Sequence, residues 1–239
     1  MPPPSRVSVC LSVFQGTNVQ NPSPRAASAS RIRLGAGAFA VAGILFVLYP
    51  AIRPFSDEAT LQGAAAFAST AWIVAHMLAM AGFILLMLGL LGFLVSLQTN
   101  PGERLAFRAL VVGLVGVGLT LPFYGGEAFG LHAVGQAAVS RNDATLLKIT
   151  EAIRTGPQLG MFLVGLLLLA VSAIMVATAI WRSGAFAKWS GVPFALGFAL
   201  YIPQFFGTQP IRVAHGLLVA AGCLWIAAGL WQQSRNSFG

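Results

Sequence analysis

A small set of ionisable side chains in or beside long apolar segments could carry chemistry in this 239-residue chain. All three histidines of the chain and one of its six acidic residues have such a position: His76, Glu127, His132 and His215. Histidine and carboxylate side chains are common ligands of zinc, iron and manganese, and they are also common proton donors and acceptors in catalysis. The first question is therefore whether the fold brings these four side chains together.

The first interpretation is a metal site built from these four residues. Three histidines and one carboxylate could hold a divalent metal such as zinc and leave room for a water, which the metal would activate for hydrolysis. Glu127 and His132 are separated by about 140° around a straight helix, so they converge only if the helix bends near Gly125 and Gly126. The sequence contains neither an HExxH nor a CxxC pattern that would strengthen this interpretation.

The second interpretation is a haem or quinone site. His76 and His215, at similar depth in different segments, could be the two axial ligands of one haem. A quinone would need only a histidine and a tyrosine or glutamate as hydrogen-bond partners. No motif supports either cofactor, and two haems across the membrane would need four histidines, so haem ranks below a divalent metal.

The third interpretation is a substrate pocket or proton path without a metal. Arg212, at the start of the last apolar segment, could bind a carboxylate or a phosphate. Tyr201 and Gln204 precede that segment and would line the same pocket. Glu127 and His132 would then serve as catalytic acid and base. Such a pocket would suit an enzyme acting on a lipid or isoprenoid substrate, or a small transporter.

Each of these residues also has a purely structural interpretation. A histidine near a helix end in lipid often bonds to a neighbouring helix or reaches the headgroups, and Arg212 would most simply lie in the membrane interface. This interpretation fits Glu127 least, because an acid between Gly126 and Ala128 in an apolar segment is costly unless it is paired.

The elements that must position these residues are membrane-spanning helices. Hydrophobic residues make up 57% of the chain and charged residues only 8%, whereas about a quarter of a soluble domain is charged. A hydrocarbon core of about 30 Å requires roughly 20 apolar residues per helical crossing. The long apolar segments lack the alternation of a barrel strand. We therefore predict an all-α fold, a polytopic integral membrane helix bundle.

Six apolar segments predict about six transmembrane helices, at 34–52, 70–97, 105–123, 158–181, 189–206 and 211–231. A seventh stretch, 128–139, is too short to span, and it could continue the third helix past a hinge at Pro122, Gly125 and Gly126 or fold back along the membrane surface. A full seventh span is the rival count. The transmembrane domain would cover 34–232, between a disordered cytoplasmic tail at 1–33 and a short C-terminal tail at 233–239.

The charge distribution predicts an orientation. If the N-terminus is cytoplasmic, the segments on that side carry nine basic residues and one acidic residue, whereas the opposite side carries five of each. Basic residues accumulate on the cytoplasmic side, so we expect cytoplasmic termini and a bacterial inner membrane. The net charge of +8 then marks topology and contact with membrane lipids, not a nucleic-acid interface, because no basic stripe interleaved with aromatic residues occurs.

Under this topology the candidate residues all lie toward the outer face. We therefore predict a multi-pass membrane protein with one polar pocket near that face, which binds a metal or small polar ligand through His76, Glu127, His132 and His215. The alternatives are a membrane-embedded enzyme acting on a lipid or isoprenoid by acid/base chemistry and, third, a small transporter.

Overall fold

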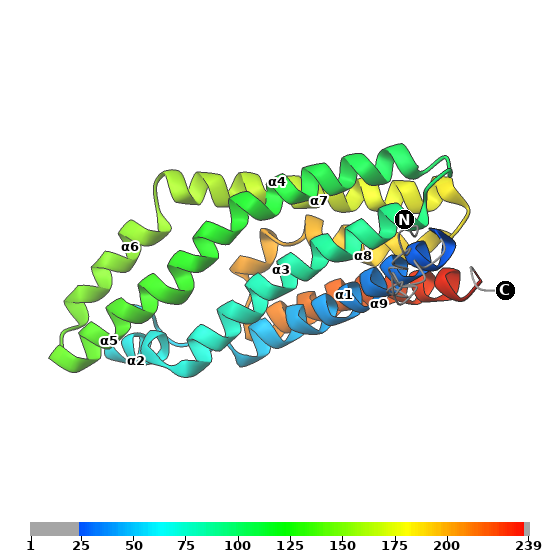
Figure 1. The fold of residues 1–239 in the computed structure, drawn as a ribbon. Coiled ribbons are helices and arrows are strands. Elements are labelled where there is room, and N and C mark those ends of the chain that lie inside the picture. Colours follow the sequence, from blue (N-terminus) through cyan, green and yellow to red (C-terminus); the bar gives the residue numbers. More distant parts are fainter. Residues whose placement is uncertain (1–23, 237–239) are drawn as a thin grey trace, which may run out of the picture.

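The computed structural model describes residues 24–236, which form a helical bundle without strands in that part of the chain (Figure 1). Five helical segments are long and apolar enough to cross a membrane. They are α1 (Pro24–Ile52), α3 (Thr70–Ser96), a helix that begins with α4 (Glu103–Gly125), α7 (Pro157–Ser183) and α9 (Gln209–Asn236). The predicted fold class, an all-α membrane helix bundle, is confirmed. Residues 24–33 of the predicted tail are helical, and residues 1–23 lie outside the described residues.

The long helices pack lengthwise through small residues. α1 lies between α3 and α9, and α4 runs along α7. The closest approach joins Gly35 of α1 to Gly92 of α3, where a Cβ atom added to either glycine would lie 2.6 Å from the Cα of the other. Close backbone contact through small residues provides dispersion attraction between helices in lipid, where burial from water provides none.

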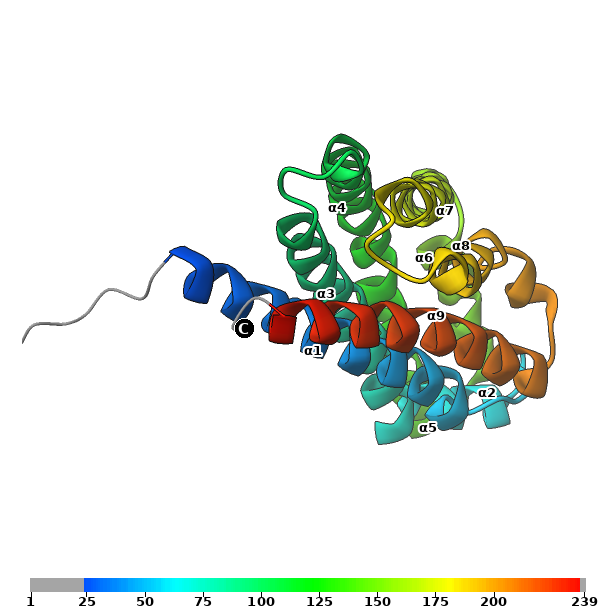
Figure 2. The same ribbon diagram turned by 90° about the vertical axis from the view of Figure 1, so that its right-hand side faces the viewer.

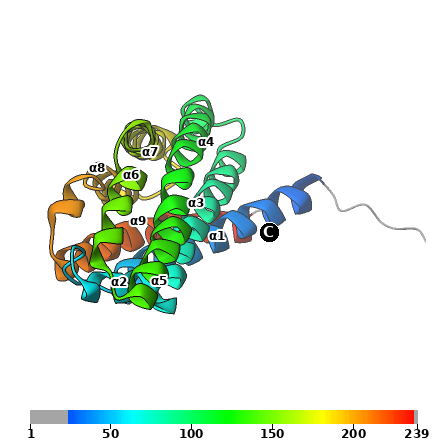
Figure 3. The ribbon, with the colours of Figure 1, turned by 90° about the vertical axis from the view of Figure 1, so that its left-hand side faces the viewer.

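Two hydrogen bonds between residues far apart in the sequence mark the two ends of the bundle. Arg33 Nε donates to Ser234 Oγ over 3.4 Å where α1 begins and α9 ends, and we call this the terminal end. At the opposite end, Gln209 Nε2 donates to the Pro50 carbonyl over 3.3 Å, which joins the start of α9 to the end of α1. Figure 2 looks along the bundle from the terminal end, and Figure 3 looks from the opposite end.

A small helical cap covers that opposite end, which we call the cap end (Figures 1 and 3). The cap has its own apolar core, in which Phe67 and Trp72 pack with Leu131 and Leu147. It consists of α2 (Leu61–Ala68), α5 (Leu131–Arg141), η2 (Ala144–Leu147) and α6 (Lys148–Arg154).

The third predicted helix runs directly into this cap. α4, the π-helical turn η1 (Gly126–Gly130) and α5 form one continuous helix of 39 residues. At 1.5 Å per residue it is about 58 Å long, roughly twice the hydrocarbon thickness. The alternative that 128–139 continues the third helix is therefore confirmed, and this stretch forms no separate seventh span.

The predicted helix at 189–206 is broken. It consists of η3 (Lys188–Gly191), α8 (Val192–Ala199) and η4 (Pro203–Phe206). Pro203 contributes to the break, because it lacks an N–H and restricts the residue before it. The chain still passes from the terminal end to the cap end here, since η3 follows α7 and η4 precedes α9 (Figure 1). The chain thus runs along the bundle six times, with five helices long enough to span.

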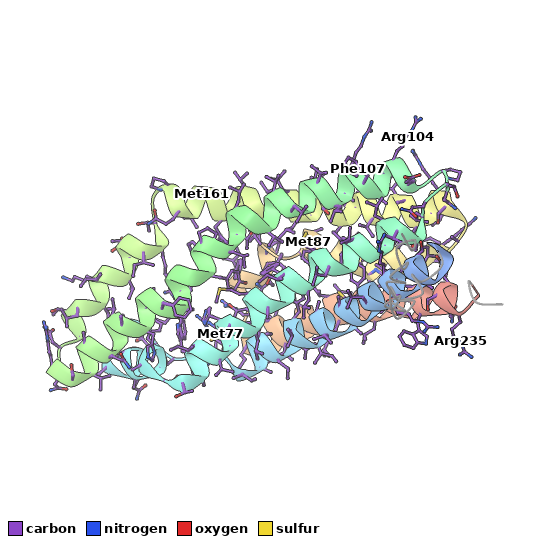
Figure 4. All side chains as sticks on the ribbon, viewed as in Figure 1. Met77, Met87, Arg104, Phe107, Met161 and Arg235 are labelled. Carbon is purple, nitrogen blue, oxygen red and sulfur yellow. The ribbon has the colours of Figure 1, made fainter. Side chains whose placement is uncertain are left out.

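The outward faces of the long helices are apolar. Met77, Phe107 and Met161 project from the bundle in Figure 4, and they are 50%, 56% and 44% exposed. Arg104 and Arg235 project at the terminal end of the same view. Apolar side chains that cover the outside of a bundle need a lipid environment, so the structure is that of a membrane-embedded protein.

Candidate functional site

Glu127 finds its partner in the cap. It lies in the π-helical turn η1, and Arg154 at the end of α6 donates to both of its carboxylate oxygens, from Nε over 2.5 Å and from Nη2 over 2.9 Å. A bidentate arginine supplies the charge and hydrogen bonds that a buried carboxylate requires. The same pair fastens the cap to the long helix.

The ion pair extends into a chain of alternating charges. Arg154 Nη1 also donates to Glu58 Oε2, and Arg53 Nη2 donates to Glu58 Oε1 over 2.9 Å. We call the series Glu127, Arg154, Glu58 and Arg53 the ion-pair chain; it joins η1, α6 and the loop that follows α1. Each of the four charges lies next to charges of the opposite sign, so each can be buried at lower cost.

Glu58 and Arg154, two members of the ion-pair chain that lie outside the spanning helices, have shifted pKa values. Burial acts to raise the pKa of Glu58, but hydrogen bonds and charge from Arg154 and Arg53 outweigh it and hold that pKa below its usual value. Burial likewise acts to lower the pKa of Arg154, and the carboxylates of Glu127 and Glu58 outweigh it and raise that pKa. Both groups therefore stay ionised at neutral pH.

His76 is the histidine that the fold brings to Glu127. It is 1% exposed, and its Nε2 lies 3.7 Å from Glu127 Oε2. Its Nδ1 lies 2.7 Å from the Trp72 carbonyl, while Trp72 Nε1 donates to the Glu127 carbonyl over 2.7 Å. Trp72 thus holds both the histidine and the backbone of the π-helical turn.

The other two histidines lie elsewhere. His132 Nδ1 contacts the Phe67 carbonyl of α2 at 2.8 Å, inside the cap. His215 Nε2 contacts the Gly197 carbonyl of α8 at 2.7 Å. Among residues 24–236, no group of three or more histidine, cysteine or acidic side chains is placed to hold a metal.

The predicted metal site of His76, Glu127, His132 and His215 is therefore not supported. The physical reason is that the hinge does not bend enough to turn His132 toward Glu127. Gly125 and Gly126 keep right-handed helical angles, with φ of −64° and −60°, and the helix continues through them.

A row of tyrosines separates His76 from His215. The chain has three tyrosines, and all three meet here. The rings of Tyr49 and His76 are 5.4 Å apart, those of Tyr49 and Tyr124 are 5.7 Å apart, and those of Tyr201 and His215 are 5.2 Å apart. The hydroxyls of Tyr124 and Tyr201 are 3.0 Å apart and share a hydrogen bond. Packed rings thus occupy the space that a haem between the two histidines would need.

A pocket of about 650 Å³ opens beside the ion-pair chain at the cap end. We call it the cap-end pocket. Its wall has a charged part and an apolar part. The residues come from α1 and the loop after it, α4, η1, α6, α7, the segment after α8, and α9. The charged part contains Arg53, Glu58, Glu127, Arg154 and Arg212, and the apolar part includes Phe123, Leu159, Phe162, Leu163, Phe205 and Phe206.

Arg212 differs from the other arginines of this wall. Its guanidinium donates to backbone carbonyls, from Nε to Gly207 over 3.1 Å and from Nη2 to Phe205 over 2.6 Å. The described part of the chain shows no ion pair between Arg212 and a carboxylate. The Phe55 ring lies 5.2 Å from Arg212 Cζ and 4.8 Å from Arg53 Cζ, so two guanidiniums contact one aromatic ring.

The other two predicted pocket residues lie deeper. Tyr201 and Gln204 are buried, and with Arg212 and His215 they line a separate cavity of about 10 Å³. This volume accommodates about one water molecule. Of the predicted substrate-binding residues, only Arg212 also lines the cap-end pocket.

Sequence reasoning missed three members of the ion-pair chain. Arg53, Glu58 and Arg154 lie in predicted outer loops, where charges are usually solvated. One signal pointed to them: the outer loops contain equal numbers of acidic and basic residues, which permits full pairing.

Comparison with known proteins gives no further guide, because no family model, curated protein or solved structure matches this chain. Fold and site together define the class. The chain is a polytopic all-α membrane protein with a capped end, a buried ion-pair chain and a two-part pocket.

Proposed function

We propose that this protein binds an anionic amphiphile, with a phospholipid as the model ligand, in the cap-end pocket. The observation that carries the proposal is Arg212, a guanidinium in the pocket wall without a carboxylate partner among the described residues. A buried or half-buried cation favours an anion beside it, and arginine binds phosphate and carboxylate groups through paired N–H donors.

The charge of the pocket wall supports a ligand with one negative charge. The wall contains three arginines and two glutamates, so one positive charge has no counterpart there. A phosphodiester headgroup carries one negative charge and two acceptor oxygens. Placed near Arg212 and Arg53, it would balance the wall without disturbing the ion-pair chain.

The apolar part of the wall supports a ligand with a hydrocarbon tail. Phe123, Phe162 and Leu163 belong to α4 and α7, helices whose outer faces are apolar. Phe206, at the rim, is 91% exposed. Such a rim lets an acyl chain pass from the surrounding lipid into the pocket while the headgroup stays at the arginines.

The proposal includes an orientation in which the cap end faces outward. Arg104 and Arg235 lie at the terminal end (Figure 4), where α7 also ends with Arg182 in its last turn and η3 begins at Lys188. This gathering of basic residues favours a cytoplasmic position for that end. The ligand would then come from the outer leaflet of a bacterial inner membrane.

Thermal unfolding of the protein purified in a neutral detergent tests the proposal. Phosphatidylglycerol should raise the Tm by several degrees, and phosphatidylcholine with the same acyl chains should not, because a ligand of the native state stabilises it by mass action. Arms with inorganic phosphate and with glycerol phosphate distinguish a lipid from a free headgroup. The substitution Arg212→Gln should remove the effect, Arg212→Lys should weaken it, and Arg104→Gln at the terminal end is the matched control.

Equal stabilisation by both lipids, or a full response in Arg212→Gln, would overturn the proposal. Stabilisation by inorganic phosphate alone would reassign the pocket to a soluble anion. Each variant is compared with its own ligand-free Tm, because Arg212 also holds two backbone carbonyls.

The geometry favours binding over the two other predicted functions. An acid/base enzyme would need Glu127 free to exchange a proton, but both of its oxygens accept hydrogen bonds from Arg154. The predicted partner His132 faces the Phe67 carbonyl instead. A transporter would need a path through the bundle, and the buried rings of Tyr124 and Tyr201 with the partly buried ring of Tyr49 fill its centre near the pocket.

A further inference from the structure

His76 has a hydrogen-bonding atom without a partner. Its Nδ1 lies 2.7 Å from the Trp72 carbonyl, and a carbonyl oxygen only accepts, so Nδ1 must carry a hydrogen. In the neutral ring, Nε2 therefore has a bare lone pair. Among the buried side-chain nitrogen and oxygen atoms of the described residues, His76 Nε2 alone makes no hydrogen bond.

This lone pair faces another acceptor. Glu127 Oε2 lies 3.7 Å from His76 Nε2, and it already accepts a hydrogen bond from Arg154 Nη2 over 2.9 Å. A carboxylate oxygen has a second lone pair and can accept again. One added proton on Nε2 would therefore turn a contact between two acceptors into an ion pair, which becomes a hydrogen bond when the 3.7 Å separation shortens, and Arg154 would keep its own bonds.

The charges around His76 have opposite effects on the binding of a proton at Nε2. Glu127, on η1, attracts a proton to Nε2, whereas the cations at the end of α1 and the end of α6 repel it. The rings that pack nearest come from His76's own helix, α1 and α4. The charged and titratable groups facing the imidazole are Glu127, Arg53, Arg154, Tyr49 and Tyr124.

The geometry points to His76 Nε2 as a proton-binding site linked to the cap-end pocket: one proton is taken up when the anionic ligand binds. The inference rests on the proposed function, because the ligand supplies the negative charge beside Arg53 that reduces repulsion of the proton. Linkage is reciprocal, so the proton must also tighten ligand binding. Proton and anion together leave the charge of the site as it was.

Calorimetric titration with phosphatidylglycerol in neutral detergent, from pH 5.5 to 7.5, measures the linkage. The wild-type protein should bind roughly fivefold or more tightly at the acid end, in the ordinary range of coupling between sites. Buffers with different heats of ionisation should report proton uptake on binding. His76→Gln should bind with little dependence on pH, while His132→Gln, in the cap and bonded to Phe67, should keep the wild-type dependence.

A ligand-free measurement keeps this inference separate from the proposed function. With only three histidines in the chain, ¹⁵N-histidine spectra of untagged protein can be assigned by comparison with His76→Gln. The His76 signal should show hydrogen on Nδ1 at neutral pH, and a hydrogen on Nε2 would overturn the inference. Two outcomes would overturn the linkage and leave the proposed function standing. One is lipid binding by the wild type that does not depend on pH, and the other is lipid binding by His76→Gln that does. Absence of lipid binding at every pH would overturn the proposed function and with it the linkage.

Discussion

At the scale of single residues, the site is explained by the cost of burying charge. Glu127 is 9% exposed within an apolar helix, and it is accommodated because Arg154 reaches it from an element 27 positions later in the sequence. The guanidinium of Arg154 also donates to the carboxylate of Glu58, and that carboxylate accepts a second hydrogen bond from Arg53. Each charge of the ion-pair chain thus lowers the cost of burying the charge next to it.

The pair of Glu127 and Arg154 should therefore be coupled in stability. Glu127→Gln alone should destabilise the protein by about 1–3 kcal/mol, because it leaves the partly buried guanidinium of Arg154 with Glu58 as its remaining charged partner. The double variant Glu127→Gln/Arg154→Gln should recover part of this loss. Unfolding of the wild type, Glu127→Gln, Arg154→Gln and the double variant in mixed micelles gives the coupling free energy, and additive effects would contradict the pairing.

From the lowered pKa of Glu58 we predict how the stability of the protein changes at acid pH. Its pKa in the folded protein lies below its ordinary value of 4.5, so the unfolded chain binds more protons in the interval between the two. Stability from Glu58 is then complete above the unfolded pKa and is lost as pH falls through the folded pKa. When the Tm is measured from pH 6 to pH 3, it should decrease once the pH is below about 4.5. The decrease should be smaller in Glu58→Gln.

At the scale of elements, the broken crossing between α7 and α9 depends on side chains from α9. In a continuing α-helix, the Tyr201 N–H would donate to the Gly197 carbonyl, but it donates to Phe198 instead, over 3.3 Å. His215 Nε2 then supplies the hydrogen for Gly197. Arg212 does the same for the carbonyls of Phe205 and Gly207 at the end of η4. Irregular backbone at membrane depth requires such partners.

The role of His215 can be tested by removing its hydrogen. His215→Leu should destabilise the protein by about 1–3 kcal/mol, since the Gly197 carbonyl loses its donor in a buried setting. His215→Gln, which retains an N–H donor, should recover part of the loss. Thermal unfolding in detergent measures both, and equal loss in the two variants would indicate packing instead of hydrogen bonding.

Two glycines, Gly92 of α3 and Gly37 of α1, give a matched test of helix packing. Gly92→Ala should be strongly destabilising, because the added Cβ would lie 2.6 Å from the Gly35 Cα across the interface with α3. Gly37→Ala adds its Cβ where no atom lies within 4 Å, so it should be neutral or slightly stabilising through helix propensity. The difference between the two Tm values measures the α1–α3 contact, and equal values would contradict it.

At the scale of the whole molecule, the chain divides into a bundle that fits a bilayer and a cap that extends beyond it. The 39-residue helix of α4, η1 and α5 belongs to both parts. The ion-pair chain, the π-helical turn and the cap-end pocket all lie at the boundary between them. This boundary is where a membrane-embedded site can combine apolar walls with buried charges.

The orientation of the whole molecule is directly testable. In a variant with Cys10→Ser and Cys223→Ala, a cysteine at Ser140 in the cap should react with a membrane-impermeant maleimide on intact bacterial cells. A cysteine at Gln98, at the terminal end, should react only after the cells are opened. The reverse pattern would invert the predicted topology and place the cap-end pocket in the cytoplasmic leaflet.

The composition and the long apolar segments determined the membrane class, the all-α fold and the approximate positions of the long helices, because lipid leaves the backbone few ways to pair its hydrogen bonds. They also indicated that Glu127 needs a partner. Which partner it finds was decided by the tertiary structure, since Arg154 comes from the short helix α6 and Glu58 from the loop after α1, and no periodic pattern in the sequence encodes where these two segments pack. The tertiary structure also decided that the three histidines lie apart. Residues in different helices meet or miss according to helix rotation and packing, and both depend on contacts such as Gly35 against Gly92 that form only when the whole bundle assembles.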